Sequence, residues 1–466
     1  MPRLKEPTPL RKAAYGRLVT HFVNYFDRLS INCRLSDVRR SVAQIKGYVY
    51  PSLPPSLYNE VCSEFLHKYL WIQRDRYENR PGCYNRAALE VLMDIDIVGL
   101  HCGAEIMKNV DHEDAHRFRR LSILKLDHPW TNVGTKNLGN FELQDLTELH
   151  YSYLCVDRDL EVIGTTCPKL LLLDIEGAKS VTDRGLRALR SCSELRILSI
   201  VGCKVSDNGV NQLLNVNEKI TEFNVGLHTF PRQRRTFDVL SRPRSLVCPY
   251  MRRFSIKSDS ITNAQLLAIV ELFPNLTHLR INGEIEGNLS TLNRLKELEE
   301  LNFVISKYDY YLPMENVNEL LASIGKNITM LNLMELKQEE LDFLYKLCVN
   351  IEFLTFCRVK YLSPNSLIVP SFKKLKTLKY SFAYSGQQIL EFSRMPKLED
   401  LYFFPITKPN YHLIQMIAAL MLDDEKFPNL ESVYAPAVAD GVRESINQRA
   451  AERNINFFFQ PSTPSY

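Results

Sequence analysis

The sequence lacks several features that would assign the chain to an enzyme or membrane class. It has no C-x-x-C pair among its 11 cysteines, no glycine-rich phosphate loop, and no nucleophile beside a plausible base. Its formal charge of +4 gives no argument for nucleic acid or a membrane surface as partner. The longest apolar run, 413–422, is half the length of a membrane span. We therefore expect a protein that is not an enzyme and that needs no cofactor or metal.

What the chain does contain is a recurring motif, L-x-x-L-x-[LIF], from about residue 121 to its C-terminus. Most successive copies lie about 22 to 25 residues apart. This period is typical of the leucine-rich repeat, in which each unit contributes one short strand and one helix. The copies begin at Leu121, Leu146, Leu170, Leu195, Ile220, Met251, Leu276, Leu298, Ile328, Ile351, Leu375, Leu398, Leu430 and, weakly, Ile455.

The repeat predicts an α/β fold, a leucine-rich-repeat solenoid over 121–466 with about 13 repeats. Because side chains alternate along a strand, Leu195, Leu198 and Ile200 should point into the stack. Ile197 and Ser199, which lie between them, should point outward. The helix layer is wider than the strand layer, so the solenoid should curve into a horseshoe with the parallel sheet on its concave face.

The best-defined helix starts follow two of these strands. Thr182-Asp183-x-Gly185 precedes one apolar-periodic run, and Ser206-Asp207-x-Gly209 precedes the next. Together with Cys203, these positions resemble the cysteine-containing leucine-rich repeats, a subtype common in substrate receptors of cullin-type ubiquitin ligases. Cys192 and Cys203 stand where the repeat needs a small buried residue, which predicts reduced thiols.

The outward positions change in character along the predicted sheet. Early strands offer mainly acidic residues, including Glu148, Asp174, Glu176 and Glu222, together with His150. Clustered aromatic and methionine side chains on the later strands are typical of the centres of protein interfaces. The candidate partner-binding residues are Arg253, His278, Arg280, Met330, Phe353, Tyr402, Phe404 and Tyr434. The alternative is a solvent-facing surface whose composition is variable.

One repeat is interrupted by a basic insertion at 227–250, which carries five arginines against a single aspartate. Such a segment can bind an acidic peptide or a phosphate. The alternative, a solvated loop on the rim, fits the small net charge better.

The first 120 residues show no repeat and predict a helical region. The segment 14–29 forms one amphipathic helix with Leu18, Phe22 and Phe26 on its apolar stripe. Leu53-Pro54-Pro55 opens a second helix, because proline is favoured in a first helical turn. A third helix is expected at 86–98. On the simplest interpretation, these helices cap the open end of the solenoid.

A more specific interpretation comes from a resemblance to the VHL-box and leucine-rich-repeat receptors of the Zyg type, which serve Cullin-2 ubiquitin ligases. Leu18 and Phe22 match the box S-L-x-x-L-C-x-x-F of that family, whereas Tyr15 and Val19 depart from it. The Leu53-Pro54 segment resembles the family's cullin-contacting element. The resemblance covers about the first 225 residues and implies Elongin C and a cullin as partners. The armadillo-type domain of those receptors is absent.

The same residues also resemble the opening of an F-box, L-P-x-x-[LI]-x-x-x-[IV]. Leu53, Pro54, Leu57, Val61 and Phe65 occupy its positions, although the second half of an F-box is missing. This resemblance implies a SKP-type adaptor. Under the two interpretations the adaptor-binding residues are Leu18, Phe22, Phe26, Leu53, Pro54, Leu57, Val61 and Phe65.

One motif points elsewhere. His112-Glu113-x-x-His116 fits the zinc-hydrolase pattern H-E-x-x-H, which would place both histidines on one face of a helix. Its surroundings are polar and supply no third ligand, so we expect no zinc chemistry there.

The sequence as a whole predicts a non-catalytic substrate-recognition subunit of a cullin-RING ubiquitin ligase. Its N-terminal helices would bind the adaptor, and the concave sheet would bind a protein substrate whose identity the sequence does not reveal. The alternatives are an F-box-type receptor and a stand-alone interaction scaffold. The N-terminus MPRLKEPTPLRK has no apolar core of a secretory signal, so we expect a cytoplasmic or nuclear protein.

Overall fold

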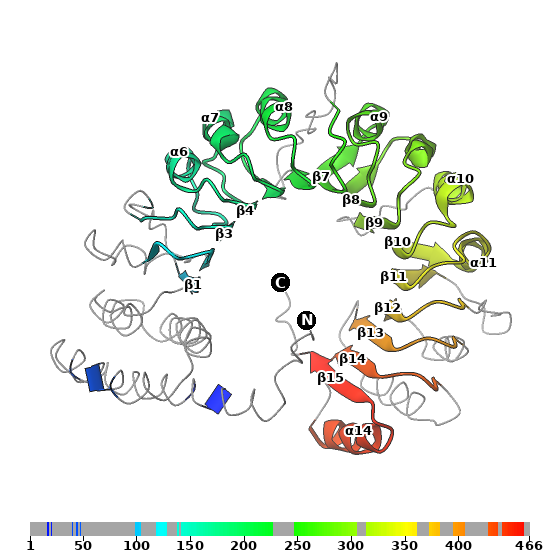
Figure 1. The fold of residues 1–466 in the computed structure, drawn as a ribbon. Coiled ribbons are helices and arrows are strands. Elements are labelled where there is room, and N and C mark those ends of the chain that lie inside the picture. Colours follow the sequence, from blue (N-terminus) through cyan, green and yellow to red (C-terminus); the bar gives the residue numbers. More distant parts are fainter. Residues whose placement is uncertain are drawn as a thin grey trace, which may run out of the picture. The chain divides into compact units, whose positions relative to one another are not determined.

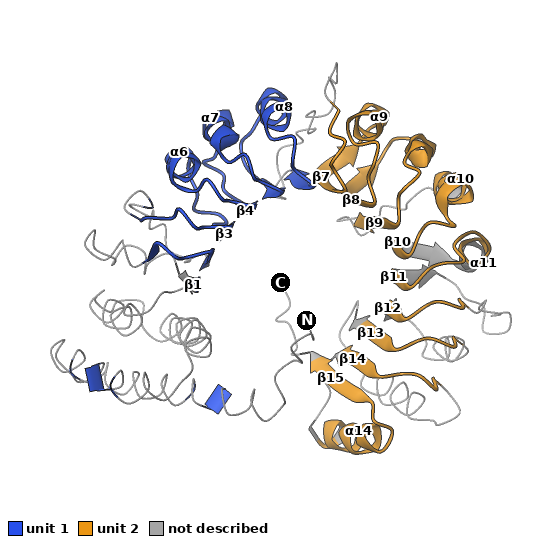
Figure 2. Cartoon of the chain, viewed as in Figure 1, with its two compact units in different colours: residues 1–229 blue, residues 230–466 orange. Residues whose placement is uncertain are grey.

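The computed structural model divides into two compact units, residues 1–229 and 230–466 (Figure 2). The structure describes residues 16–17, 20, 40, 43–44, 47, 98–103, 118–127, 138, 141–226, 247–304, 314–360, 372–382, 395–405, 427–436 and 440–460. Within these ranges there are fifteen strands, β1–β6 in the first unit and β7–β15 in the second. Neighbouring strands within each unit follow chain order.

The first unit alternates short strands with helices that lie on one side of the sheet (Figure 1). Its strands are β1 (Gly99–Gly103), β2 (Ile123–Asp127), β3 (Glu148–His150), β4 (Leu172–Asp174), β5 (Ile197–Ser199) and β6 (Glu222–Gly226). Its helices are α6 (Asp157–Thr166), α7 (Asp183–Ala188) with the 3-10 turn η4 (Leu189–Ser191), and α8 (Asp207–Val216). All five strand pairs are parallel.

The second unit repeats this arrangement with longer strands, again all in parallel pairs. Its strands are β7 (Arg253–Ile261), β8 (His278–Ile285), β9 (Glu300–Val304), β10 (Met330–Lys337), β11 (Phe353–Lys360), β12 (Thr377–Phe382), β13 (Asp400–Pro405), β14 (Ser432–Pro436) and β15 (Asn456–Gln460). Its helices are α9 (Asn263–Leu272), the 3-10 helix η5 (Leu289–Arg294), α10 (Met314–Ile324), α11 (Gln338–Leu347) and α14 (Asp440–Glu452).

The repeat motif places the core as expected. Each of the fourteen residues that begin a copy of the motif, from Leu121 to Ile455, is at most 6% exposed. The second apolar position is buried as well in the thirteen copies from Leu121 to Leu430, and these side chains stand in register across the strands. In the first unit, Leu149, Leu173 and Leu198 form such a row and are each 0% exposed. The chain therefore has the α/β leucine-rich-repeat solenoid fold that the sequence predicts.

A tight turn precedes the strands of successive repeats. The backbone N–H at the start of the motif donates to the carbonyl three residues earlier, as Leu195 does to Cys192 at 3.1 Å. The residue that supplies this carbonyl is buried beneath the turn, and the position holds a cysteine in some repeats and a larger apolar residue such as Phe273 in others. Cys167, Cys192, Cys248 and Cys348 all occupy it.

The thiols in the core should be poor nucleophiles in the native protein. Burial raises the pKa of Cys192 and Cys203 to about 12 each, and that of Cys167 to about 11. Only the thiolate reacts with maleimides, so we expect labelling of these cysteines by N-ethylmaleimide to be roughly 100-fold slower in buffer than in 8 M urea. Peptide mass spectrometry resolves each site. Equal rates in the two solvents would contradict the buried positions.

A carboxylate at the start of one repeat helix binds the start of the next helix. Asp183 is the first residue of α7, and its carboxylate accepts hydrogen bonds from the backbone N–H of Ser206 at 2.7 Å and from the Ser206 hydroxyl. Ser206 in turn caps α8, because its hydroxyl oxygen accepts from the N–H of Gly209 at 3.2 Å. Asp157 makes the same contacts with Thr182 one repeat earlier. The two helix starts predicted from the [ST]-D-x-G motif are therefore confirmed.

Glycine is required at the end of this motif. A Cβ on Gly209 would lie 2.3 Å from Asp183 Oδ1, and a Cβ on Gly185 would lie 2.5 Å from Asp157 Oδ1. Both distances are far below van der Waals contact. The motif thus joins consecutive repeats through a carboxylate that only a residue without a side chain can accommodate.

The sheet begins earlier than the motif indicates. Strand β1, Gly99–Gly103, pairs with β2 in register, so it lies within the segment 1–120 that the sequence assigns to the helical region. Its inward residue Leu100 is 2% exposed and stands opposite Leu124. The segment Ile97-x-x-Leu100-x-Cys102 is a degenerate copy of the motif, because cysteine replaces its last leucine. This copy overlaps the expected third helix, 86–98, and was therefore not counted among the repeats.

Several expectations fall outside the described residues. The eight candidate adaptor-binding residues, the H-E-x-x-H segment and most of the basic insertion belong to this part of the chain. The last residues of the insertion, 247–250, are described, and they form the turn in which buried Cys248 accepts a hydrogen bond from Met251. Among the helices that the structure describes, none combines the length and apolar character of a membrane span.

Candidate protein-binding face

The outward residues of the second unit form a continuous surface, because its strands pair in register. One row of outward residues crosses every strand from β7 to β15. We call this row the central row. It consists of Ser255, Arg280, Asn302, Asn332, Thr355, Lys379, Tyr402, Tyr434 and Phe458.

The end of the face at β7 and β8 is cationic. Arg253 and Arg280 are exposed, and Lys257 on β7 is half-buried beside them. Arg280 stands opposite Ser255, midway between Arg253 and Lys257 on the neighbouring strand. His278 lies opposite Arg253 and is within 3.0 Å of Glu300 on β9. We call Arg253, Lys257 and Arg280 the cationic end.

The other end of the face carries a stack of aromatic rings. Tyr402 and Tyr434 lie on adjacent strands with ring centroids 4.1 Å apart and planes inclined by 2°. Phe458 continues the stack from Tyr434 at 4.8 Å and 17°. At the other end of the stack, Lys379 Nζ lies over the Tyr402 ring, 4.9 Å from its centroid. We call Tyr402, Tyr434 and Phe458 the aromatic ladder.

Stacking in this geometry has two physical consequences. Parallel rings across neighbouring strands stabilise each other by about 1 kcal/mol beyond the area they bury. Burial, together with the hydrogen bond to Tyr434, raises the pKa of Tyr402 to about 12, so its hydroxyl keeps its proton at neutral pH. The ladder therefore presents hydroxyl groups and ring edges, rather than charges, on the outward face.

Phe458 was not anticipated by the repeat motif. Counted from Ile455, the motif would place Phe458 inward, at the position that Leu198 has in the copy from Leu195. In the structure Phe457 pairs with inward Val433, and Phe458 pairs with outward Tyr434. A shift of one residue exchanges the two faces of a strand. The turn before this strand also differs, because the N–H of Ile455 donates to the carbonyl of Ala450, five residues earlier, and Asn454 lies in the left-handed region at φ 56°.

Most of the predicted partner-binding residues lie on this one face. Arg253 and Arg280 are exposed, Phe353 is 38% exposed, and His278, Met330, Tyr402 and Tyr434 are half-buried. The backbone of Phe404 lies in β13, opposite Ser381. The structure brings Met330 next to Phe353, and Tyr402 next to Tyr434. Lys379 and Phe458 join the set as residues that the sequence did not single out.

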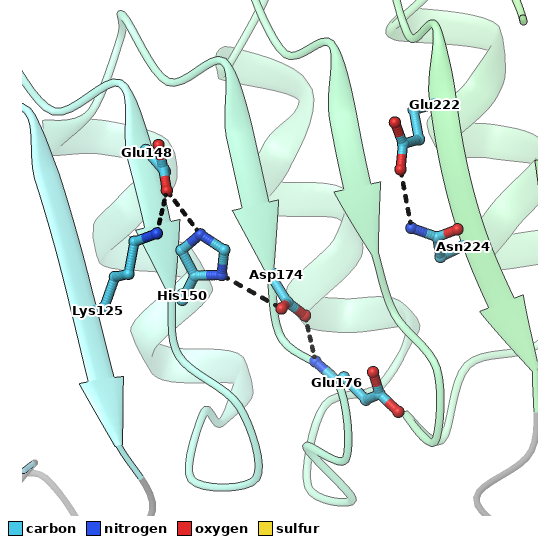
Figure 3. A network of polar contacts seen from close by, with 7 residues as sticks. All are labelled: Lys125, Glu148, His150, Asp174, Glu176, Glu222 and Asn224. Carbon is cyan, nitrogen blue, oxygen red and sulfur yellow. Dashed lines mark hydrogen bonds and ion pairs between the residues drawn. The ribbon is translucent and has the colours of Figure 1, made fainter. Parts of the chain in front are cut away.

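The outward face of the first unit is different, because its charged residues are bound to one another (Figure 3). His150 Nε2 lies 2.8 Å from Glu148, and its Nδ1 lies 3.3 Å from Asp174 on the next strand. Lys125 contacts the same Glu148 oxygen at 2.8 Å. Ser199, which follows Asp174 in this row, is only 8% exposed although it points outward. The acidic character predicted for these strands is thus partly neutralised within the protein.

This network gives a dependence of stability on pH. The hydrogen bond from Lys125 lowers the pKa of Glu148, and contacts with His150 act in the same direction against a raising effect of burial. A carboxyl group whose pKa is lowered by folding stabilises the folded state at pH values above its pKa in the unfolded chain, about 4.3. This contribution is lost as the pH falls through its pKa in the folded protein.

We therefore expect Glu148→Gln to cost up to about 1 kcal/mol at pH 7 and nothing at pH 3, because the site is partly exposed. Urea unfolding of both proteins at the two pH values measures the difference. Glu142→Gln is the matched control, since Glu142 is an exposed glutamate of the same unit, and it should change stability little at either pH. A larger cost for Glu148→Gln at pH 3 than at pH 7 would reverse the assigned sign.

Within the described ranges, no three His, Cys, Asp or Glu side chains are grouped as ligands of a metal ion would be. The outward face of the second unit carries hydrogen-bonding, cationic and aromatic side chains. These are the means by which protein surfaces hold other macromolecules.

No protein-family model matches the chain. Solved structures with some similarity to it include Rad7 in its complex with Elc1 from yeast, with 10% identity and a TM-score of 0.36 over 92% of this chain and 93% of that one. A leucine-rich-repeat protein of Leptospira interrogans, LIC12759, has 15% identity and a TM-score of 0.31 over 83% and 94%. Internalin C2 of Listeria monocytogenes has 17% identity and a TM-score of 0.26 over 53% and 84%. The repeat fold assigned to this chain follows from its own strands and their register.

Proposed function

We propose that the protein is a non-catalytic subunit that holds a target protein on the outward sheet face of its second unit. The observation that carries this proposal is the aromatic ladder, which leaves Phe458 46% exposed at its end. Aromatic side chains on an exposed face cost solubility, and they supply most of the binding energy where protein interfaces use them. Phe353, 38% exposed on the same face, adds to this apolar surface.

We propose further that the target is presented to a cullin-RING ubiquitin ligase. Support comes from the sequence, in which Leu18 and Phe22 match the VHL box and Leu53, Pro54 and Leu57 match the segment that follows it. In such an assembly the gain in rate comes from proximity, because the ligase core carries out the chemistry. An F-box-type receptor, which would bind a SKP-type adaptor through Leu53, Pro54 and Leu57 without Leu18 and Phe22, is the second candidate.

The adaptor separates these possibilities. The full chain is co-expressed with Elongin B and C, or with a SKP-type adaptor, and purified through its own tag. We expect one adaptor to co-purify in equal amount. Leu18→Asp with Phe22→Asp should abolish Elongin C binding under the first interpretation, whereas Leu57→Asp with Val61→Asp should abolish SKP binding under the second.

Val216→Asp is the matched control, because Val216 is an apolar residue of α8 that is 49% exposed, and its substitution by aspartate should leave either adaptor bound. If neither adaptor co-purifies with the unaltered chain, the ligase proposal fails. A stand-alone interaction scaffold then remains, since the binding face of the second unit does not depend on an adaptor.

A further inference from the structure

The two ends of the central row differ in chemistry, and both belong to one unit of the structure. Arg280, the second residue of the row, stands near one end and Phe458 at the other, joined by unbroken register across β8 to β15. Seven strand spacings of about 4.8 Å separate them, a path of roughly 34 Å. A peptide that contacts both ends therefore lies against cations at one of its ends and against aromatic rings at the other.

The cationic end brings three like charges together, and Glu300, the carboxylate diagonal to Arg280 on β9, already contacts His278. Arg253 and Lys257 lie on one strand on either side of Arg280 on the next, and like charges at such cross-strand positions repel each other. Arg253 and Arg280 are both exposed, so they remain accessible to a partner. Guanidinium groups bind carboxylates through two parallel hydrogen bonds, which favours acidic side chains in the partner.

The middle of the row is neutral and polar. Asn332 Nδ2 donates to Asn302 Oδ1 at 2.9 Å, and Thr355 and Lys379 follow on the next two strands. Amides and hydroxyls both donate and accept hydrogen bonds, so they suit the backbone of a peptide irrespective of its side chains. This stretch adds no preference for charge until Lys379.

The aromatic end calls for apolar side chains. Tyr402 and Tyr434 cover each other's ring faces, and Tyr434 covers one face of Phe458. What remains open is the row of ring edges with the outer side of Phe458, which suits leucine or tryptophan side chains packed across the ladder.

We infer that the partner of this face is a peptide segment of a protein with acidic residues toward one end and large apolar residues toward the other. The acidic residues bind Arg253, Lys257 and Arg280, and the apolar residues pack on the aromatic ladder. At about 3.3 Å per residue, an extended segment of about ten residues spans the row. This inference rests on the proposed function, in which the same face holds the target protein.

A single-stranded nucleic acid is a poorer fit to the same face. Bases bind proteins by stacking on open aromatic faces, and the faces of Tyr402 and Tyr434 are closed by their neighbours. Phosphates along a strand would also need cations beside the aromatic rings, and the ammonium group of Lys379 there is accompanied by a carboxylate. The carboxylate of Asp400 lies on the same strand as Tyr402, two residues before it.

The test uses five fluorescein-labelled probes and fluorescence anisotropy with the full chain. Two 14-residue peptides carry Asp-Glu-Asp at one end and Leu-Trp-Leu at the other, in opposite orders along the chain, joined by a Gly-Ser spacer. A third peptide is a scrambled version of the same composition, and a fourth has lysine in place of each acidic residue. The fifth probe is a 12-nucleotide oligouridine.

We expect one of the two ordered peptides to bind at least tenfold more tightly than the scrambled and lysine peptides. Arg253→Glu with Arg280→Glu should weaken this binding at least tenfold and make it less sensitive to salt. Tyr434→Ala and, separately, Phe458→Ala should each weaken it about fivefold without changing its salt dependence. Lys204→Glu, an exposed charge reversal in the first unit, and Phe343→Ala, 50% exposed on α11, are the matched controls.

Equal binding of ordered and scrambled peptides would overturn the inference, as would tighter binding of the lysine peptide or the oligouridine. Failure of both ordered peptides to bind at about 1 mM would do the same, since no useful affinity then remains. None of these outcomes decides whether the protein binds a ligase adaptor, which is tested by co-purification. Adaptor co-purification depends on the N-terminal residues, and it does not change with the peptide result.

Discussion

Gly209→Ala is expected to destabilise the first unit by about 3 kcal/mol, although alanine is the better helix former. Gly209 lies in the first turn of α8, where alanine would otherwise add about 0.5 to 1 kcal/mol. Its new Cβ would lie 2.3 Å from Asp183 Oδ1 and 2.5 Å from Asp183 Cγ. That carboxylate is held by two hydrogen bonds from Ser206, so it cannot rotate away without losing them.

A double-mutant cycle separates the steric cause from the loss of hydrogen bonds. Asp183→Ala alone should cost about 2 kcal/mol, because it removes a charged acceptor from the N–H and the hydroxyl of Ser206. With the carboxylate gone, most of the overlap with the Cβ added by Gly209→Ala disappears. The double variant should therefore be at least about 1 kcal/mol more stable than the sum of the single effects predicts.

Urea unfolding followed by far-UV circular dichroism measures these differences. Gly441→Ala is the matched control, since Gly441 also lies near the start of a helix, α14, and a Cβ there would have no atom within 4 Å. It should leave the protein as stable as before or slightly more so. If Gly209→Ala behaved like Gly441→Ala, or if the cycle were additive, the carboxylate link between repeats would be wrong.

The core of this fold was predictable because it repeats. The motif needs only local information, since each copy buries its first leucine under the turn before a strand, and every predicted copy is buried in the structure. Leu121 and Leu398, which lie far apart in the sequence, follow the same rule. The helix starts at Thr182 and Ser206 were predictable for the same reason, because a cap is recognised from three or four neighbouring residues.

The link between repeats was not predictable from the motif, although the motif contains it. The sequence pattern predicts Asp183 to be an ordinary acidic residue in a first helical turn, where it would interact with its own helix. Its hydrogen bonds instead go to Ser206, 23 residues later. The contact depends on the spacing of stacked helices, which single-sequence periodicity does not report.

The candidate binding face was predictable in part. Alternation along each strand assigned Tyr402 and Tyr434 to the outward face, and the structure confirms this. It could not assign Phe458, because the turn before β15 differs from the other turns and the strand pairs one residue out of the expected register. Lys379 was overlooked for another reason. A lysine on an exposed strand is ordinary until the ring of Tyr402 is found beside its ammonium group.

Phe303 and Phe353 provide the sharpest test of the division between core and binding face in the second unit. Both are strand phenylalanines, two strands apart in the sheet order. Phe303 is 0% exposed, so Phe303→Ala should cost about 4 kcal/mol through lost burial and the cavity that remains. Phe353 is 38% exposed, so Phe353→Ala should cost about 1 kcal/mol.

Charged substitutions at the same two positions widen the contrast. Phe303→Lys would leave an unpaired ammonium group in the apolar interior, and we expect the unit to lose its folded structure. Phe353→Lys keeps its charge in water, and we expect a folded protein with an unfolding free energy within about 1 kcal/mol of the Phe353→Ala value. Circular dichroism and urea unfolding of the four variants measure both effects. Comparable losses at the two positions would mean that Phe353 is part of the core, and the apolar surface offered to a partner would then lie elsewhere on the protein.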